Sequence, residues 1–161
     1  MLKKIRQRSQ DMQKLSSVMT EALKIASEDG SQAAGAQHLL LAAIAMEDDD
    51  SGRQAFAAGG ADPDQLSDAI ERAIGAGVPS IELPEAASAA GGSQMKVDAA
   101  FDEAIKATHA VHNAHGDVRP LRAAHFVAGV ASAEHGVAVR ALAEMGLDRA
   151  ALIEAATEAA R

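Results

Sequence analysis

The sequence predicts an all-α fold built from two tandem, pseudo-symmetric four-helix repeats, eight helices in all. Composition is the first observation behind this prediction, because 48% of the residues are apolar but only three are aromatic. Alanine favours helices, whereas β-sheets need the branched and aromatic side chains that are scarce here. The second observation is a duplication: QHLLLAAIA around His38 is echoed by AHFVAGVA around His125. Matched segments lie 82 to 87 residues apart, so one supersecondary unit is used twice.

The first repeat is expected to span residues 15–75, after a basic lead-in over residues 1–14. Apolar residues spaced three and four apart predict its first helix from Leu15 to Ala26, and Ile5 and Met12 continue this stripe backwards. Residues 37–46 are apolar almost all round, which indicates a buried helix, and a short helix follows to about residue 59. Asp62 and Pro63 form a helix start, and the buried stripe of that fourth helix is Leu66, Ala69, Ile70, Ala73 and Ile74.

The second repeat is expected to span residues 97–161 and to follow the same plan. Residues 76–96 lose the helical periodicity and gather Gly, Pro, Ser and Ala, which is typical of a linker. Apolar positions from Val97 to Val111 then predict a first helix, residues 120–133 a buried one and residues 136–145 a short one. Asp148 is placed to cap the last helix.

The distribution of charge excludes several classes of function. The formal charge is −8, although the first fourteen residues are basic, so the body of the chain is strongly acidic. An acidic, aromatic-poor protein is not expected to bind nucleic acid. No apolar run approaches the ~20 residues that span a bilayer, so we expect no membrane insertion. The absence of cysteine fits a cytoplasmic location.

The duplicated unit, with its buried His-Leu-Leu-Leu-Ala helix and Gly-x-Asp breaks, resembles the double Clp repeat. That repeat forms the N-terminal domain of the Clp AAA+ unfoldases, the ClpA, ClpC and ClpB group. The resemblance covers residues 15–160 and implies a non-catalytic, protein-interaction domain that docks adaptors or substrates. No lysine follows a glycine, so the phosphate loop of the ATPase modules is absent from this chain. The basic lead-in and the end at Arg161 favour a free-standing chain over an excised domain.

The resemblance also places the candidate binding residues, which are Gln37, Ala124, Met95 and Val97. Relatives commonly carry Glu before the repeated His, and in ClpC-type domains these acids resemble a site for phosphoarginine. Gln37 and Ala124 occupy those positions here and supply no carboxylate to pair with a guanidinium, so phosphoarginine recognition is not expected. Met95 and Val97 lie where relatives begin their second repeat, and the identity of the partner is open. We expect a monomer with no enzymatic activity, cofactor or metal.

The main alternative to a protein-interaction function rests on the histidines. His38 and His125 are expected to bond neighbouring loops rather than to transfer protons. His109, His112 and His115 are spaced by three and could present imidazoles to a metal. The alternative function is therefore a free-standing Clp-repeat protein that binds a small ligand or metal, or that sequesters Clp partners. The acidic run from Glu47 to Asp50 is expected to be a solvated loop that caps the next helix.

Overall fold

The computed structural model describes residues 2–77, 96–114 and 119–161, and these residues form eight α-helices, as the sequence predicts. The predicted linker lies almost entirely outside the described residues, and so does Met95. The helices of the first repeat are α1 (Leu2–Glu28), α2 (Ala36–Ala45), α3 (Ser51–Ala58) and α4 (Leu66–Gly77), the last preceded by a 3₁₀ turn, η1 (Pro63–Gln65). Those of the second are α5 (Ala99–Ala114), α6 (Ala123–Ala131), α7 (Val137–Glu144) and α8 (Arg149–Ala159).

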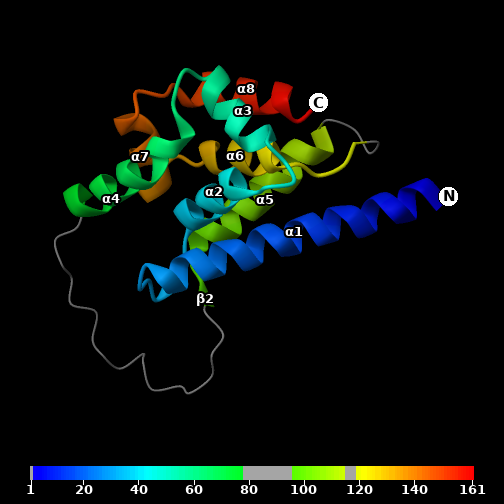
Figure 1. The fold of residues 1–161 in the computed structure, drawn as a ribbon, viewed down its shortest axis with the longest axis horizontal. Helices are drawn as coiled ribbons and strands as arrows, with labels where there is room; N and C mark the ends of the chain where they lie inside the picture. Colours follow the sequence, from blue (N-terminus) through cyan, green and yellow to red (C-terminus); the bar gives the residue numbers. More distant parts are fainter. Residues whose placement is uncertain (1, 78–95, 115–118) are drawn as a thin grey trace, which may run out of the picture.

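The two repeats share one core instead of forming two separate bundles. Within each repeat the first two helices pack together, α1 on α2 and α5 on α6. The last two helices of each repeat cross over to the other one, because α3 packs on α8 and α4 packs on α7 (Figure 1). The same contact pattern therefore occurs in both halves, and each half completes the other.

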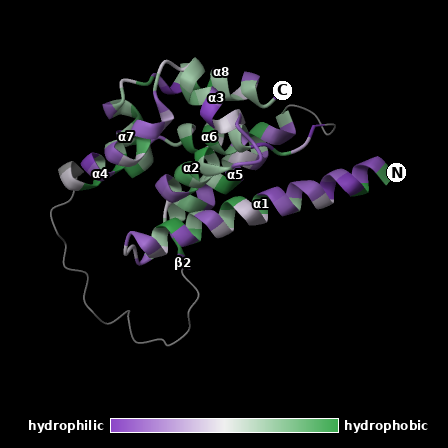
Figure 2. Cartoon of the chain, viewed as in Figure 1, coloured by the Kyte–Doolittle hydropathy of each residue, from purple (hydrophilic) through white to green (hydrophobic). Residues whose placement is uncertain are grey.

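Helix α6 is the centre of this core. All of its residues from Ala123 to Ala131 are buried, and the helix packs against α5, α8, α2 and α3. Both α2 and α6 are coloured as mainly hydrophobic along their length, in contrast to the start of α1 (Figure 2). Leu40 and Phe126 are fully buried, so the prediction of two buried helices with equivalent places in the repeats is confirmed.

Three apolar residues of the predicted stripes are exposed. Ile5 and Met12 expose 63% and 72% of their surface, because α1 runs without a break through the basic lead-in and extends past the helices that cover its second half (Figure 1). No Gly or Pro interrupts residues 2–28, so helix propensity carries the helix to Leu2. Ile74 is 43% exposed because it lies at the edge of the α4 stripe, beside the buried row of Leu66, Ala69, Ile70 and Ala73.

A short parallel strand pair joins the two repeats at one point. Strand β1 (Ala33–Ala34) lies before α2, and β2 (Lys96–Val97) lies before α5, in the register Ala33 to Lys96 and Ala34 to Val97. The Asp98 amide extends the pairing by donating to the Ala34 carbonyl at 2.9 Å. None of the helices in the described parts of the chain is both long and apolar enough to cross a membrane.

Candidate functional site

Two of the predicted binding residues, Gln37 and Val97, lie on the two segments that join the repeats: Val97 is in β2, and Gln37 is in the first turn of α2, just after β1. We call this place the repeat junction and define it by Gly35, Gln37, Val97 and Asp98. Val97 pairs with Ala34 in the strand register, and both Gln37 and Val97 are half-buried. Met95, the third predicted residue, immediately precedes β2 but lies outside the described residues.

Gly35 brings two polar side chains together at the repeat junction. A Cβ atom built on Gly35 would lie 2.5 Å from Gln37 Oε1 and 2.8 Å from Asp98 Oδ2. The amide and the carboxylate therefore lie against the bare backbone of this glycine, and a side chain there would displace them. Asp98 Oδ1 accepts a hydrogen bond from the Phe101 amide at 2.8 Å, so this residue also caps α5. The sequence analysis missed Asp98, although an Asp just before an apolar helical stripe is a capping signal.

Ala124, the fourth predicted residue, lies at the start of α6 and has no exposed surface. A partner cannot contact its side chain without displacing its neighbours. The backbone at this helix start is occupied as well, because Asp49 Oδ2 accepts from the Ala123 amide at 2.8 Å and Ser51 Oγ accepts from the Ala124 amide at 3.0 Å. Ala124 is the position equivalent to Gln37 in the second repeat, and contacts from the first repeat occupy it.

The acidic loop is exposed at Glu47, Asp48 and Asp50, as expected, but the side chain of Asp49 is not. Its Asp48 side chain is 70% exposed, but that of Asp49 is 8% exposed. The loop does cap the next helix, since Asp49 Oδ1 accepts from the Ser51 amide at 3.1 Å, and it caps α6 in addition. Burial raises the pKa of Asp49, but bonds from Ser51 and Ala123, together with the Lys14 ammonium at 3.4 Å, outweigh it and lower the pKa below its ordinary value.

The repeated histidines close the first turn of the two central helices, as predicted. His38 Nδ1 accepts from the Gly35 amide at 2.8 Å, and His125 Nδ1 accepts from the Arg122 amide at 2.9 Å. Because Nδ1 of His38 is an acceptor, its proton is on Nε2, which donates to Asp29 Oδ2 at 2.7 Å.

This proton placement also bears on catalysis at His38. Ser31 Oγ lies 3.4 Å from the same Nε2 atom that bonds Asp29. A catalytic triad needs the serine and the carboxylate on opposite ring nitrogens, with a free lone pair facing the serine. The Ser31, His38 and Asp29 group therefore does not have the geometry of a triad.

The three histidines behind the alternative function are His109, His112 and His115, and the two that the structure describes differ in exposure and bonding. His109 is exposed, but His112 Nε2 lies 2.8 Å from the Arg119 carbonyl and is engaged as a donor. The His112 ring also packs edge-on against His125, with ring centroids 5.0 Å apart. His115 lies outside the described residues, and the rest of the described chain holds no group of three or more His, Cys, Asp or Glu side chains arranged for a metal.

These observations define an all-α double repeat with a shared core and a strand-paired junction. The chain belongs to the family of the Clp repeat (R) N-terminal domain, whose profile matches residues 12–118. This membership links the protein to the Clp chaperone and protease system, and the family is one of non-catalytic domains.

A solved structure shares the fold. The N-terminal domain of the caseinolytic protease associated chaperone ClpD from Arabidopsis thaliana superposes with a TM-score of 0.59 at 19% sequence identity. The match covers 87% of each chain. No curated protein matches the sequence.

Proposed function

We propose that this chain is a non-catalytic protein-interaction domain of the Clp ATP-dependent unfoldase and protease system, where it docks adaptors or substrates. The observation that carries the proposal is the family match over residues 12–118, because Clp N-domains of this family bind adaptors and substrates. The shared core supports it, since a rigid helical scaffold can present a binding surface without first becoming ordered.

The repeat junction is the docking surface in this proposal. Gln37 and Val97 are half-buried there, so each offers part of its surface while its backbone is held by α2 and β2. A few anchored contacts of this kind carry most of the affinity at protein interfaces. Met95, the residue before β2 in the sequence, is also a candidate contact, and it lies outside the described residues. Ala124 would not contact the partner directly. Its backbone amide donates to Ser51 Oγ and so helps to hold the start of α3 in place.

Phosphoarginine is not part of the proposed recognition. Gln37 has no charge, and Ala124 has no exposed surface. Asp98 does bring one carboxylate next to Gln37, but its Oδ1 atom already caps α5. A guanidinium needs a bidentate or paired acidic partner for strong binding.

Affinity capture from a lysate of the source organism tests the proposed docking. The bait is the full chain, compared with the Gln37→Ala and Val97→Ala variants and with Gln13→Ala, which changes an exposed glutamine on α1. We expect Clp adaptors, unfoldase or protease subunits on the wild-type and Gln13→Ala baits and less of them on the junction variants. Free phosphoarginine should not compete. Recovery of no Clp component would refute the proposed function, and equal recovery on all baits would refute the proposed surface.

The non-catalytic part of the proposal has its own test. Purified chain should release no phosphate from ATP and should not cleave a casein-derived peptide, because the phosphate-loop motif is absent from the sequence and the His38 group lacks triad geometry. Turnover that stays with the protein through a second purification step would contradict this prediction.

A further inference from the structure

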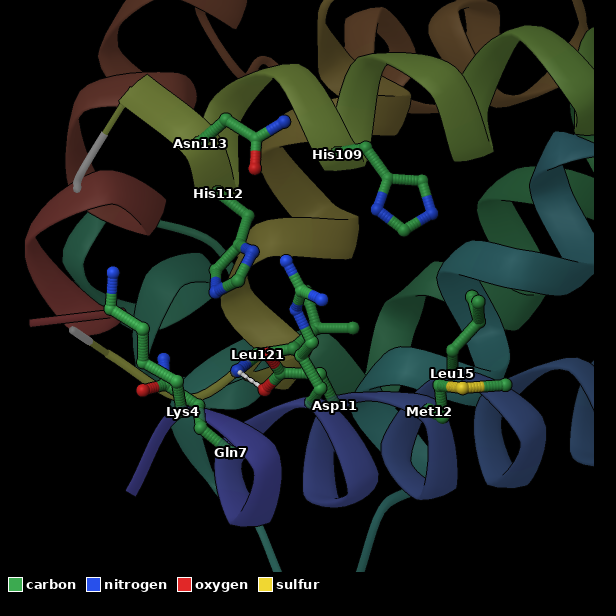
Figure 3. Close-up of a pocket in the computed structure, with 10 residues that line it drawn as sticks. Lys4, Gln7, Asp11, Met12, Leu15, His109, His112, Asn113 and Leu121 are labelled. Carbon is green, nitrogen blue, oxygen red and sulfur yellow. Dashed lines mark hydrogen bonds between the residues drawn. The ribbon is translucent and has the colours of Figure 1, made fainter. Parts of the chain in front are cut away.

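A groove of about 380 Å³ lies between the N-terminal half of α1 and the end of α5. In Figure 3, Lys4, Gln7, Asp11, Met12 and Leu15 rise from α1 on one side, and His109, His112 and Asn113 face them from α5. Arg8 and Leu121 complete the lining. This groove is separate from the repeat junction, since it shares no residue with it.

Hydrogen bonds hold the two walls of the groove together. Asp11 Oδ1 accepts from the Leu121 amide at 2.7 Å, and Gln7 Nε2 donates to the Arg119 carbonyl at 2.6 Å. The same carbonyl accepts from His112 Nε2 at 2.8 Å, so α1 and α5 are joined through one atom. The basic lead-in is thereby attached to the second repeat, and the groove between them is preformed.

The rim of the groove is positively charged in an otherwise acidic protein. Lys4 and Arg8 are exposed, lie one helical turn apart, and neither forms an ion pair with the residues that the structure describes. Asp11, the carboxylate of the lining, is engaged by the Leu121 amide. The whole chain carries a charge of −8, so this rim is a local exception that attracts anionic groups.

Part of the groove lining is apolar. Met12 is 72% exposed although it belongs to the lining, and Leu15 packs beside it at the edge of the core. A free inorganic anion would use the cations and leave this apolar surface in water. A segment with both acidic and apolar side chains would use both, because a flexible thioether next to cations suits a peptide of varied sequence.

We infer that this groove binds an acidic peptide segment of a protein partner, with a carboxylate against Lys4 and Arg8 and an apolar side chain against Met12 and Leu15. The inference goes beyond docking at the repeat junction and does not depend on it. Both cations are on one face of a helix that the Asp11 and Gln7 bonds attach to the second repeat, so both border the groove.

Fluorescence anisotropy with a short labelled peptide tests the inference. The probe has two glutamates flanked by leucines, and the matched peptide has glutamines in their place. The full chain is compared with Lys4→Ala/Arg8→Ala and with Lys3→Ala/Arg6→Ala. The second pair removes the same charge from the same helix, but neither residue lines the groove. All four residues are exposed, so both variants should keep the fold, which circular dichroism checks.

We expect the glutamate peptide to bind and the groove variant to bind it about tenfold or more weakly, as for loss of charge-assisted hydrogen bonds. The control variant should change the affinity by less than about twofold, because its exposed charges do not line the groove and would act on the peptide only through solvent. Equal weakening in both variants would overturn the inference, because the helix would then attract the peptide by charge alone. No binding at up to about 1 mM peptide, or equal binding of the glutamine peptide, would overturn it too. So would vesicles of anionic phospholipid that displace the peptide, since the basic helix would then be a membrane-binding one.

Discussion

At the scale of single residues, Asp49 shows how one carboxylate can connect two repeats. It accepts hydrogen bonds from Ser51 at the start of α3 and from the Ala123 amide at the start of α6, and Lys14 of α1 lies beside it. Three helices therefore meet at a side chain that is 8% exposed. A buried acceptor that serves several donors is costly to remove, because the donors are left without partners.

Asp49→Asn should lower the free energy of unfolding at neutral pH by about 1–3 kcal/mol, since the amide is uncharged and a weaker acceptor. Denaturant titration measures the change, with Asp48→Asn as a control on a side chain that is 70% exposed. An equally large loss of unfolding free energy in the Asp48→Asn control would show that the stability depends on the charge of the loop and not on the bond from Asp49 to α6.

The pH dependence of this contribution follows from the lowered pKa of Asp49. Its folded-state pKa lies below the ordinary value of 3.8, so the ionised form stabilises the fold. The contribution is complete above the unfolded-state value and is lost as the pH falls through the folded-state pKa. Wild-type stability should therefore fall more steeply than that of Asp49→Asn in this acidic range. Parallel curves would contradict the assignment.

The sequence predicts local roles of residues better than distant ones. His38 and His125 were expected to bond nearby loops, and they do so within three residues of their own helix starts. The acidic loop was expected to cap the helix that follows it, which is also a local contact. Its bond to Ala123 joins residues 74 positions apart, and no local pattern contains that information.

At the scale of elements, the contact between α5 and α6 depends on Gly129. A Cβ atom at this position would lie 2.7 Å from the Thr108 amide nitrogen and 2.9 Å from the Ala104 carbonyl oxygen. Both neighbours are backbone atoms of α5, so they cannot move aside as a flexible side chain would. The absence of a side chain lets these two helices approach closely.

Gly129→Ala should therefore destabilise the protein by about 1–3 kcal/mol through overpacking, although alanine favours helices. Gly75→Ala is the matched control, because Gly75 is also helical and has no atom within 4 Å of the added methyl group. That change should stabilise by about 0.5–1 kcal/mol from propensity alone. Thermal unfolding of both variants checks the pair, and stabilisation by both would mean that α5 and α6 can separate without cost.

Periodicity predicted every helix, because an apolar stripe at a spacing of three and four is required wherever a helix is covered on one side. It was less reliable at the ends of elements. The stripe through Ile5 and Met12 continues into a part of α1 where these two side chains stay exposed, and periodicity did not predict the groove between this part of α1 and the end of α5. The β1–β2 pair has two residues in each strand, too few for any alternation to be visible.

At the scale of the whole molecule, the duplication predicted the fold but not the way in which the halves interlock. Two four-helix units could have formed two separate bundles with the same sequence pattern. Instead α3 packs on α8 and α4 on α7, and α6 of the second repeat contacts α2 and α3 of the first. The predicted site residues are separated for the same reason: Gln37 and Val97 belong to the segments of the repeat junction, whereas the start of α6 at Ala124 is bonded to Ser51 of the other repeat.

An interlocked core predicts that neither repeat folds alone. Residues 1–77 would lack the cover that α7 and α8 give to α4 and α3, and residues 96–161 would expose the face of α6 that packs on α2. Each half should have low helix content by circular dichroism and no cooperative unfolding transition, because a chain of this size is only marginally stable and each half would lose the helices that cover its apolar faces. Mixing the two halves should restore helicity and one transition. The full chain with Gly75→Ala, which alters helix propensity outside the interface, should still unfold in a single step. A cooperative transition in either isolated half would show that the repeats are independent units, and the shared core would then be a contact between two finished domains.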